Sequence, residues 1–218
     1  IAALIPGSGL NFSSEDFLER VQNPSGLVDI DFWGSPLTLE GLLAPGEFTI
    51  GRDTSLEDFL LQLENRQMLN FTPDLIARLA EQGLTPYEGL ILASIVEREA
   101  VVDEEKPMIA SVFLNRLAIG MRLDSDPTVQ YAAGYNEIQA TWWSNPISWE
   151  QLQIDSPYNT YIYSGLPPAP ICSPSFNAIE AVAFPEDSPY YYFRAACDGS
   201  GKHLFAETYE EHLLNECP

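Results

Sequence analysis

The segment from Thr85 to Ala100 constrains the fold of this chain most, because it carries the most complete set of helix signals. Thr85 is a favoured N-cap residue, Pro86 suits the first helical position, and Glu88 completes a capping box three residues after Thr85. The residues that follow, EGLILASIVEREA, include the longest apolar run of the chain, at 90–96, which only Ser94 interrupts. We therefore expect a helix over this whole segment.

Cap and stop residues of the same kinds predict further helices. They lie at 14–21, 55–63, 73–82, 107–119, 126–134, 175–184 and 209–215, with Asp126 as the expected cap of its helix. The strings YYYFRAA and HLFAE, on either side of DGSGK, are typical of two strands. We expect residues 38–49 to form a loop or short strand, and residues 136–175, with six prolines, to be irregular and functional. This pattern predicts an α+β fold.

The length and charge of the chain limit its functions. Its 218 residues suit one domain, or one domain with a small appendage, and its 45% hydrophobic residues can bury a core. The formal net charge of −22 argues against binding to nucleic acid and to anionic lipid. No apolar stretch approaches the roughly 20 residues of a membrane span. Since the chain begins with Ile1, we expect it to be a processed piece, with any anchor upstream.

The three cysteines, Cys172, Cys197 and Cys217, all lie in the last quarter of the chain. Their spacing does not fit a zinc site, and only two histidines are available to help. One disulfide with one free thiol is an option outside the cytoplasm, and three buried thiols is the other. Spacing alone does not choose among the three pairings.

The motifs of metal, nucleotide and common serine-hydrolase chemistry are missing, so carboxylate chemistry remains. At about 100° per residue, Glu99 projects among the apolar residues 92, 95 and 96, whereas Glu97 lies roughly 160° around the helix. Burial in an apolar face raises the pKa of a carboxyl, as in the general acid of lysozyme. Glu99 is therefore the candidate acid and base, and a salt bridge to a buried arginine is its structural alternative.

Glycosidases usually pair two carboxylates, so a glycosidase of this kind would need a second one beside Glu99. Asp124, Asp126 and Asp155 are the candidates, although Asp126 also suits a helix cap and Asp155 a turn. None of them stands out, which favours a mechanism with one carboxylate and a nucleophile supplied by the substrate.

Aromatic residues are dense in the irregular segment, and aromatic faces pack against the apolar faces of sugars. Six of them fall within 22 residues: Trp142, Trp143, Trp149, Tyr158, Tyr161 and Tyr163. We expect about half of them to plug the core beneath the loop instead.

Several long strings together resemble one family. LASIVEREA at 92–100, IASVFLNRLAIGMRLDSDPTVQY at 109–131 and DSPYNTYIYSGLPPAPI at 155–171 are similar to the YceG-like, MltG-type endolytic murein transglycosylases. LEGLLAPGEF at 39–48, YYYF at 190–193 and GKHLF at 201–205 match the entry and the closing segment of that family. The chain departs from the family pattern at Ala44, Phe48 and Cys172-Ser173.

The resemblance implies a lysozyme-like helical catalytic core with added short strands at 38–218, preceded by a remnant of an N-terminal, LysM-like region at 1–37. It implies that Glu99 is catalytic and cuts the MurNAc-β-1,4-GlcNAc bond without water, leaving a 1,6-anhydroMurNAc end. It implies no metal and no cofactor. Its partners would be peptidoglycan strands and the wall-synthesis machinery, on the extracytoplasmic face of the membrane, with an N-terminal anchor that lies outside this chain.

We expect a set of polar side chains to hold the substrate. They are Ser111, Asn115, Asp126, Thr128, Tyr158, Asn159, Thr160, Tyr161 and His203. Ser111 and Asn115 lie one helical turn apart and face the same way. Asn159 and Tyr161 could equally fasten the loop to the core, and His203 could serve the hairpin. A hydrolytic muramidase and a glycan-binding module are the competing functions.

Overall fold

The computed structural model describes residues 1–217 and has the expected α+β class. The helices are α1 (Ser14–Gln22), α2 (Ile30–Trp33), α3 (Leu56–Met68), α4 (Pro73–Glu81), α5 (Pro86–Glu99), α6 (Lys106–Ala118), α7 (Asp126–Ala133), α8 (Trp149–Leu152), α9 (Phe176–Ala183) and α10 (Tyr209–Leu214). Two short 3-10 turns lie at Ala2–Leu4 and Asp103–Glu105, and the strands are β1 (Tyr192–Ala195) and β2 (His203–Ala206). The strands pair antiparallel.

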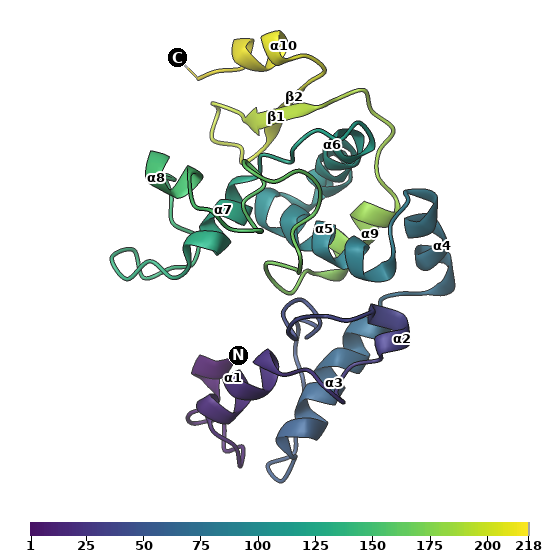
Figure 1. Ribbon diagram of the computed structural model, residues 1–218, viewed down its shortest axis with the longest axis vertical. Coiled ribbons are helices and arrows are strands. Elements are labelled where there is room, and N and C mark those ends of the chain that lie inside the picture. Colours follow the sequence, from purple (N-terminus) through teal and green to yellow (C-terminus); the bar gives the residue numbers. More distant parts are fainter. Residues whose placement is uncertain (218) are drawn as a thin grey trace.

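Helix α5 lies at the centre of the fold (Figure 1). Its predicted capping box is confirmed, because Thr85 Oγ1 accepts the Glu88 N–H at 3.2 Å and Glu88 Oε2 accepts the Thr85 N–H at 2.9 Å. Every residue from 89 to 96 is buried, and α5 packs against α6, α7 and α9. A central helix of this kind fixes the position of the residue at its end, Glu99.

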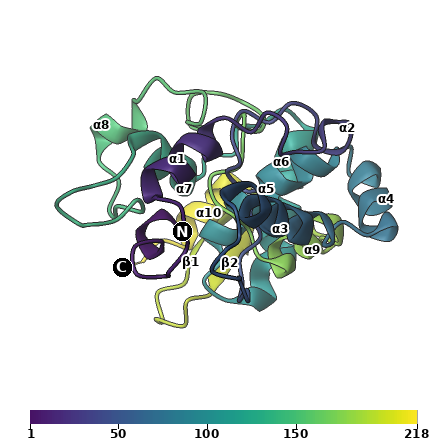
Figure 2. The same ribbon diagram turned by 90° about the horizontal axis from the view of Figure 1, so that it is seen from below.

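Helices α1–α3 form a layer beneath the central helices in Figure 1. Seen from that end in Figure 2, α4 lies at one side of the molecule and the segment that carries α8 at the opposite side. Trp33 is fully buried and donates from Nε1 to Glu64 Oε1 at 2.7 Å, and it belongs to the same hydrophobic cluster as the central helices. The domain boundary between residues 37 and 38 stays a prediction.

The segment 38–49 contains neither helix nor strand and turns at residues 40–42, so the loop alternative is the right one. Gly41 explains the absence of a strand there. Its φ of +80° is a left-handed conformation, and a Cβ on it would lie 2.4 Å from Pro170 Cβ. Gln67 Nε2 donates to the Gly41 carbonyl at 3.0 Å, which holds this loop between α3 and the segment around Pro170.

Three expectations about helices were wrong in detail. Helix α3 continues to Met68, five residues beyond its predicted end, because Gln67 in its last turn is anchored to the loop at Gly41. The short helices α2 and α8 were not predicted, since four residues carry no periodic pattern. Helix α7 has Ser125 at its N-cap position rather than Asp126.

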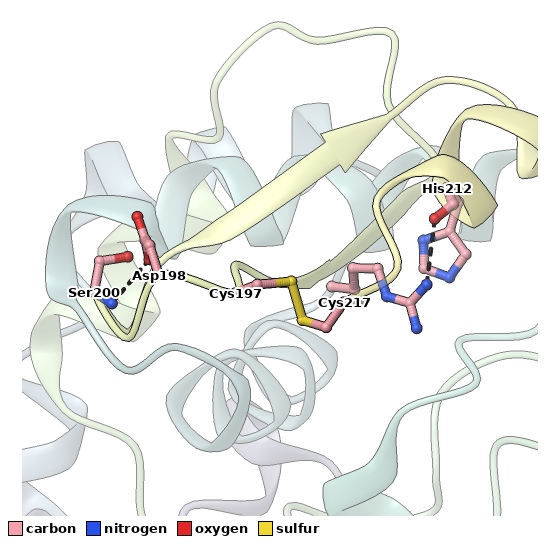
Figure 3. Close-up of a disulfide and its surroundings, with 6 residues drawn as sticks. Cys197, Asp198, Ser200, His212 and Cys217 are labelled. Atoms are coloured by element: carbon pink, nitrogen blue, oxygen red, sulfur yellow. Dashed lines mark hydrogen bonds between the residues drawn. A yellow bond between two sulfur atoms is a disulfide. The ribbon is translucent and has the colours of Figure 1, made fainter.

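The C-terminal end is held by a disulfide between Cys197 and Cys217, 20 residues apart (Figure 3). It joins the end of β1 to the segment after α10, a helix that buries none of its residues and packs on β1 and β2. The option of one disulfide and one free thiol is the one that the structure shows. Cys172 is the free thiol, and its Sγ lies 3.3 Å from the Ser94 carbonyl.

No helix within residues 1–217 is long and apolar enough to cross a membrane. Within the same residues, no group of three or more His, Cys, Asp or Glu side chains could hold a metal ion.

Candidate active site

Glu99 is the last residue of α5, and its carboxyl is closely surrounded by protein while the residue keeps a limited exposure. The Ser125 hydroxyl donates to Glu99 Oε1 at 2.5 Å. Among the ion pairs of residues 1–217, none involves Glu99, so the alternative of a salt bridge to a buried arginine is wrong. The carboxyl is therefore oriented by a neutral donor and remains free to exchange a proton.

Burial raises the pKa of Glu99 from its ordinary 4.5 to about 7. The Ser125 hydrogen bond lowers the Glu99 pKa, the negative charge of Asp126 raises it, and the positive charge of Arg116 lowers it. The desolvation cost exceeds the stabilisation of the charged form by these neighbours. A carboxyl with this pKa can act as an acid and then as a base near neutral pH.

Glu97, two residues earlier, faces another set of partners. Lys106 Nζ donates to Glu97 Oε2 at 2.9 Å, and the Ser175 hydroxyl donates to the same oxygen at 2.6 Å. Glu97 thus anchors the start of α9 to α5 and α6. The predicted divergence of the two glutamates around the helix is confirmed.

Ser125 is held in place by a buried network. Its backbone N–H donates to Thr160 Oγ1 at 3.0 Å, and its carbonyl accepts the Thr128 hydroxyl at 2.7 Å. The two threonine hydroxyls are 2.8 Å apart, and all three residues are at most 1% exposed. Thr128 and Thr160 were predicted to hold substrate, but their hydroxyls are occupied here in fixing Ser125 against Glu99.

Asp126 follows Ser125 and begins α7, where its side chain stays exposed. The Tyr161 hydroxyl donates to Asp126 Oδ1 at 2.7 Å. Burial and this carboxylate both raise the pKa of Tyr161, which keeps the phenol protonated as a donor. The expectation that Asp126 caps the helix is wrong, because its carboxylate is turned to Tyr161. The structure therefore brings Asp126 and Tyr161 together beside Glu99.

Arg116 is a buried residue of this region that sequence reasoning did not identify. Its Nε donates to the Tyr191 carbonyl at 2.6 Å, and one terminal nitrogen donates to the Leu123 carbonyl at 2.5 Å. It thereby ties α6 to the residue before β1 and to the segment before Ser125. No sequence signal separates it from an ordinary arginine on a helix surface.

The loop residues Asn159 and Tyr158 contact other parts of the protein. Asn159 is fully buried and donates from Nδ2 to the carbonyls of Leu152 and Ile154 at 3.0 and 2.9 Å. Tyr158 is half-buried, with its ring centroid 4.9 Å from that of Tyr131. The alternative that Asn159 fastens the loop is the one that the structure shows.

Three further candidates make contacts that do not include Glu99. Ser111 Oγ lies 2.8 Å from Ser188 Oγ, and Asn115 Nδ2 donates to the Ser188 carbonyl at 2.8 Å, so both face the same segment as predicted. His203 Nδ1 lies 2.9 Å from Glu105 Oε2 at the base of the hairpin. A substrate role for these three residues stays a prediction.

The tryptophans of the irregular segment differ in exposure. Trp149 and Trp142 are 72% and 49% exposed, whereas Trp143 lies under the Arg98 guanidinium, 3.9 Å from ring centroid to Cζ. A groove of about 810 Å³ lies elsewhere, between the α4–α5 loop, α6 and residues 166–168, and Glu99 is not among its lining residues. The site is thus defined by its side-chain contacts rather than by this groove.

Ser125→Ala should raise the pKa of Glu99 further. The variant removes a hydrogen bond to the charged carboxylate, and such bonds contribute about 1.5–3 kcal/mol, which corresponds to a shift of about one unit or more. A ¹³C NMR titration of the glutamate side chains would measure it. Ser111→Ala, which removes another buried hydroxyl, is the matched control and should leave the Glu99 titration unchanged. An unshifted Glu99 in Ser125→Ala would contradict the assigned contact.

The chain belongs to the YceG-like family, whose family model matches residues 11–216. It is 35% identical over 175 residues to the endolytic murein transglycosylase of Bacillus subtilis (strain 168), covering 80% of this chain and 46% of the relative. It is 34% identical over 182 residues to that of Streptococcus pneumoniae serotype 2 (strain D39), covering 84% of this chain and 32% of the relative. The chain thus spans less than half the length of these curated relatives.

A crystal structure of a yceG-like protein from Listeria monocytogenes has the same fold. It superposes with a TM-score of 0.77 at 34% sequence identity, covering 94% of this chain and 68% of the other. The fold therefore extends over almost the whole of the present chain, and its likeness to lysozyme stays a prediction.

Proposed function

We propose that this chain is the catalytic part of a lytic murein transglycosylase, which cuts peptidoglycan strands between MurNAc and GlcNAc. The observation that carries the proposal is the Glu99 carboxyl, which has a pKa near 7, no ion pair and one orienting hydroxyl. The relatives named as endolytic murein transglycosylases support the substrate and the internal mode of cleavage. We propose that the site acts on the cell-wall side of the membrane, where the wall-synthesis machinery would be its partner.

In the proposed reaction, Glu99 donates its proton to the glycosidic oxygen as the bond to the MurNAc anomeric carbon breaks. The acetamido carbonyl oxygen of the same sugar bonds to that carbon and forms an oxazolinium ion. The Glu99 carboxylate then takes the proton of the C6 hydroxyl, whose oxygen attacks the anomeric carbon and displaces the acetamido oxygen. Glu99 has given and regained one proton, the product is a 1,6-anhydro ring, and no cofactor is required.

A hydrolytic muramidase is the second candidate, because Asp126 supplies another carboxylate beside Glu99. In that reaction a water would be added, and the product would end in a reducing MurNAc. A glycan-binding module is the third candidate, and it would cut nothing.

Purified peptidoglycan digested in ¹⁸O-labelled water distinguishes the three functions by mass spectrometry. We expect fragments lighter than the hydrolytic products by one water, with no ¹⁸O incorporated during cleavage. Heavy-oxygen reducing ends would establish the muramidase, and intact strands that co-sediment with the protein would establish the binding module. Either of these results would overturn the proposal.

A further inference from the structure

We infer that Asp126 accepts a hydrogen bond from the acetamido N–H of the reacting sugar and so stabilises the oxazolinium ion. Tyr161 holds the Asp126 carboxylate in position for this contact. The inference rests on the proposed function and deepens it, because it names the group that balances the positive charge of the oxazolinium ion. Glu99 can serve the leaving oxygen and the C6 hydroxyl, but it is not available to balance the positive charge on the acetamido nitrogen at the same time.

The position of Asp126 meets this need. Ser125 donates to Glu99 at 2.5 Å, and Asp126 is the next residue in the chain, at the start of α7. The Asp126 charge acts on Glu99 and on Tyr161. Asp126 is exposed, unlike the threonines around it, so an incoming sugar can reach it.

The orientation of Asp126 is fixed from one side only. Tyr161 Oη occupies Asp126 Oδ1 at 2.7 Å, and within residues 1–217 Oδ2 has no hydrogen-bond donor. Asn159 supports Tyr161, because its Oδ1 accepts the Tyr161 backbone N–H at 3.0 Å. One carboxylate oxygen is thus held by a rigid scaffold and the other is left for a substrate donor. A carboxylate accepts such a donor more strongly as the N–H becomes positively charged, which favours the intermediate over the ground state.

Asp126→Asn tests the inference, with Asp155→Asn as the matched control. Asp155 is also an exposed aspartate that accepts a tyrosine hydroxyl, from Tyr163 at 2.6 Å, but it is not among the groups that act on Glu99. We expect kcat on peptidoglycan strands to fall about 10- to 100-fold in Asp126→Asn with a small change in KM, as for a lost charge-assisted hydrogen bond. Asp155→Asn should keep kcat within about twofold of wild type. This change is much smaller than the roughly tenfold loss expected when a charged hydrogen bond to the substrate is removed.

Binding of MurNAc-thiazoline, a stable mimic of the oxazolinium ring, gives a second readout by calorimetry. Asp126→Asn should weaken thiazoline binding about 10- to 100-fold while binding of the unreacted GlcNAc-MurNAc disaccharide stays within a few-fold. Equal weakening of both ligands, or a kcat like that of wild type, would overturn the inference. Neither result would contradict the role of Glu99, whereas an active Glu99→Gln protein would overturn the proposed function itself.

Discussion

Replacing Glu99 with glutamine is expected to abolish cleavage of peptidoglycan while leaving the fold intact. Glutamine has nearly the same shape and can still accept the Ser125 hydrogen bond, but it has no proton to give to the glycosidic oxygen. General acid–base catalysis by one side chain contributes about 10²–10⁴-fold, and Glu99 supplies both the acid and the base of the proposed reaction. The rate of release of anhydro-ended fragments should therefore fall by at least about 10²- to 10⁴-fold.

Glu97→Gln is the matched control for this experiment. It makes the same chemical change two residues away, on a side chain that binds Lys106 and Ser175 rather than a substrate. Its activity should stay within a few-fold of wild type, although weakening a charged hydrogen bond should cost roughly 1–3 kcal/mol of folding free energy. A Glu99→Gln protein that still releases anhydro ends, or an inactive but folded Glu97→Gln protein, would refute the assignment.

The parts of the fold that sequence reasoning reached are those specified by neighbours in the chain. The capping box of α5 joins residues three apart, and the direction of Glu99 follows from the 3.6-residue period of the same helix. The two strands were predicted from the strings YYYFRAA and HLFAE on either side of DGSGK, and they pair as an antiparallel hairpin. In each case the residues that carry the signal lie close together in the sequence.

The residues that complete the site could not be predicted from local sequence patterns. Ser125 meets Glu99 across 26 positions of sequence, and Thr160 meets Ser125 across 35. Hydroxyl residues at such separations carry no periodic pattern, so only the packing of α5, α7 and the irregular loop brings them together. The sequence likewise did not show that Thr128 and Asn159, predicted to bind substrate, donate hydrogen bonds to the carbonyls of Ser125 and Leu152.

The environment that suits Glu99 to catalysis should also make the protein less stable as the pH rises. Between its ordinary pKa of 4.5 and its folded pKa of about 7, the folded protein keeps a proton on Glu99 that the unfolded chain has released. The unfolded state then binds fewer protons, so the free energy of unfolding falls with increasing pH. At about 1.4 kcal/mol per pKa unit, and with allowance for the limited exposure of the residue, the loss is about 2–3 kcal/mol by pH 8.

Glu99→Gln isolates this contribution, because every other titrating group is common to the two proteins and cancels in the difference. Measured by urea unfolding, the variant should match wild type near pH 4 and exceed its stability by about 2–3 kcal/mol at pH 8. The cleavage rate of wild type requires protonated Glu99 for its first step, so it should fall above the same pH of about 7. The stability difference should thus stop growing near the pH at which the cleavage rate falls, so two unrelated measurements report the same folded pKa of Glu99. A stability difference that does not change between pH 5 and 8 would mean that the carboxyl titrates as if it were in water, and the proton could not then be held for the glycosidic bond.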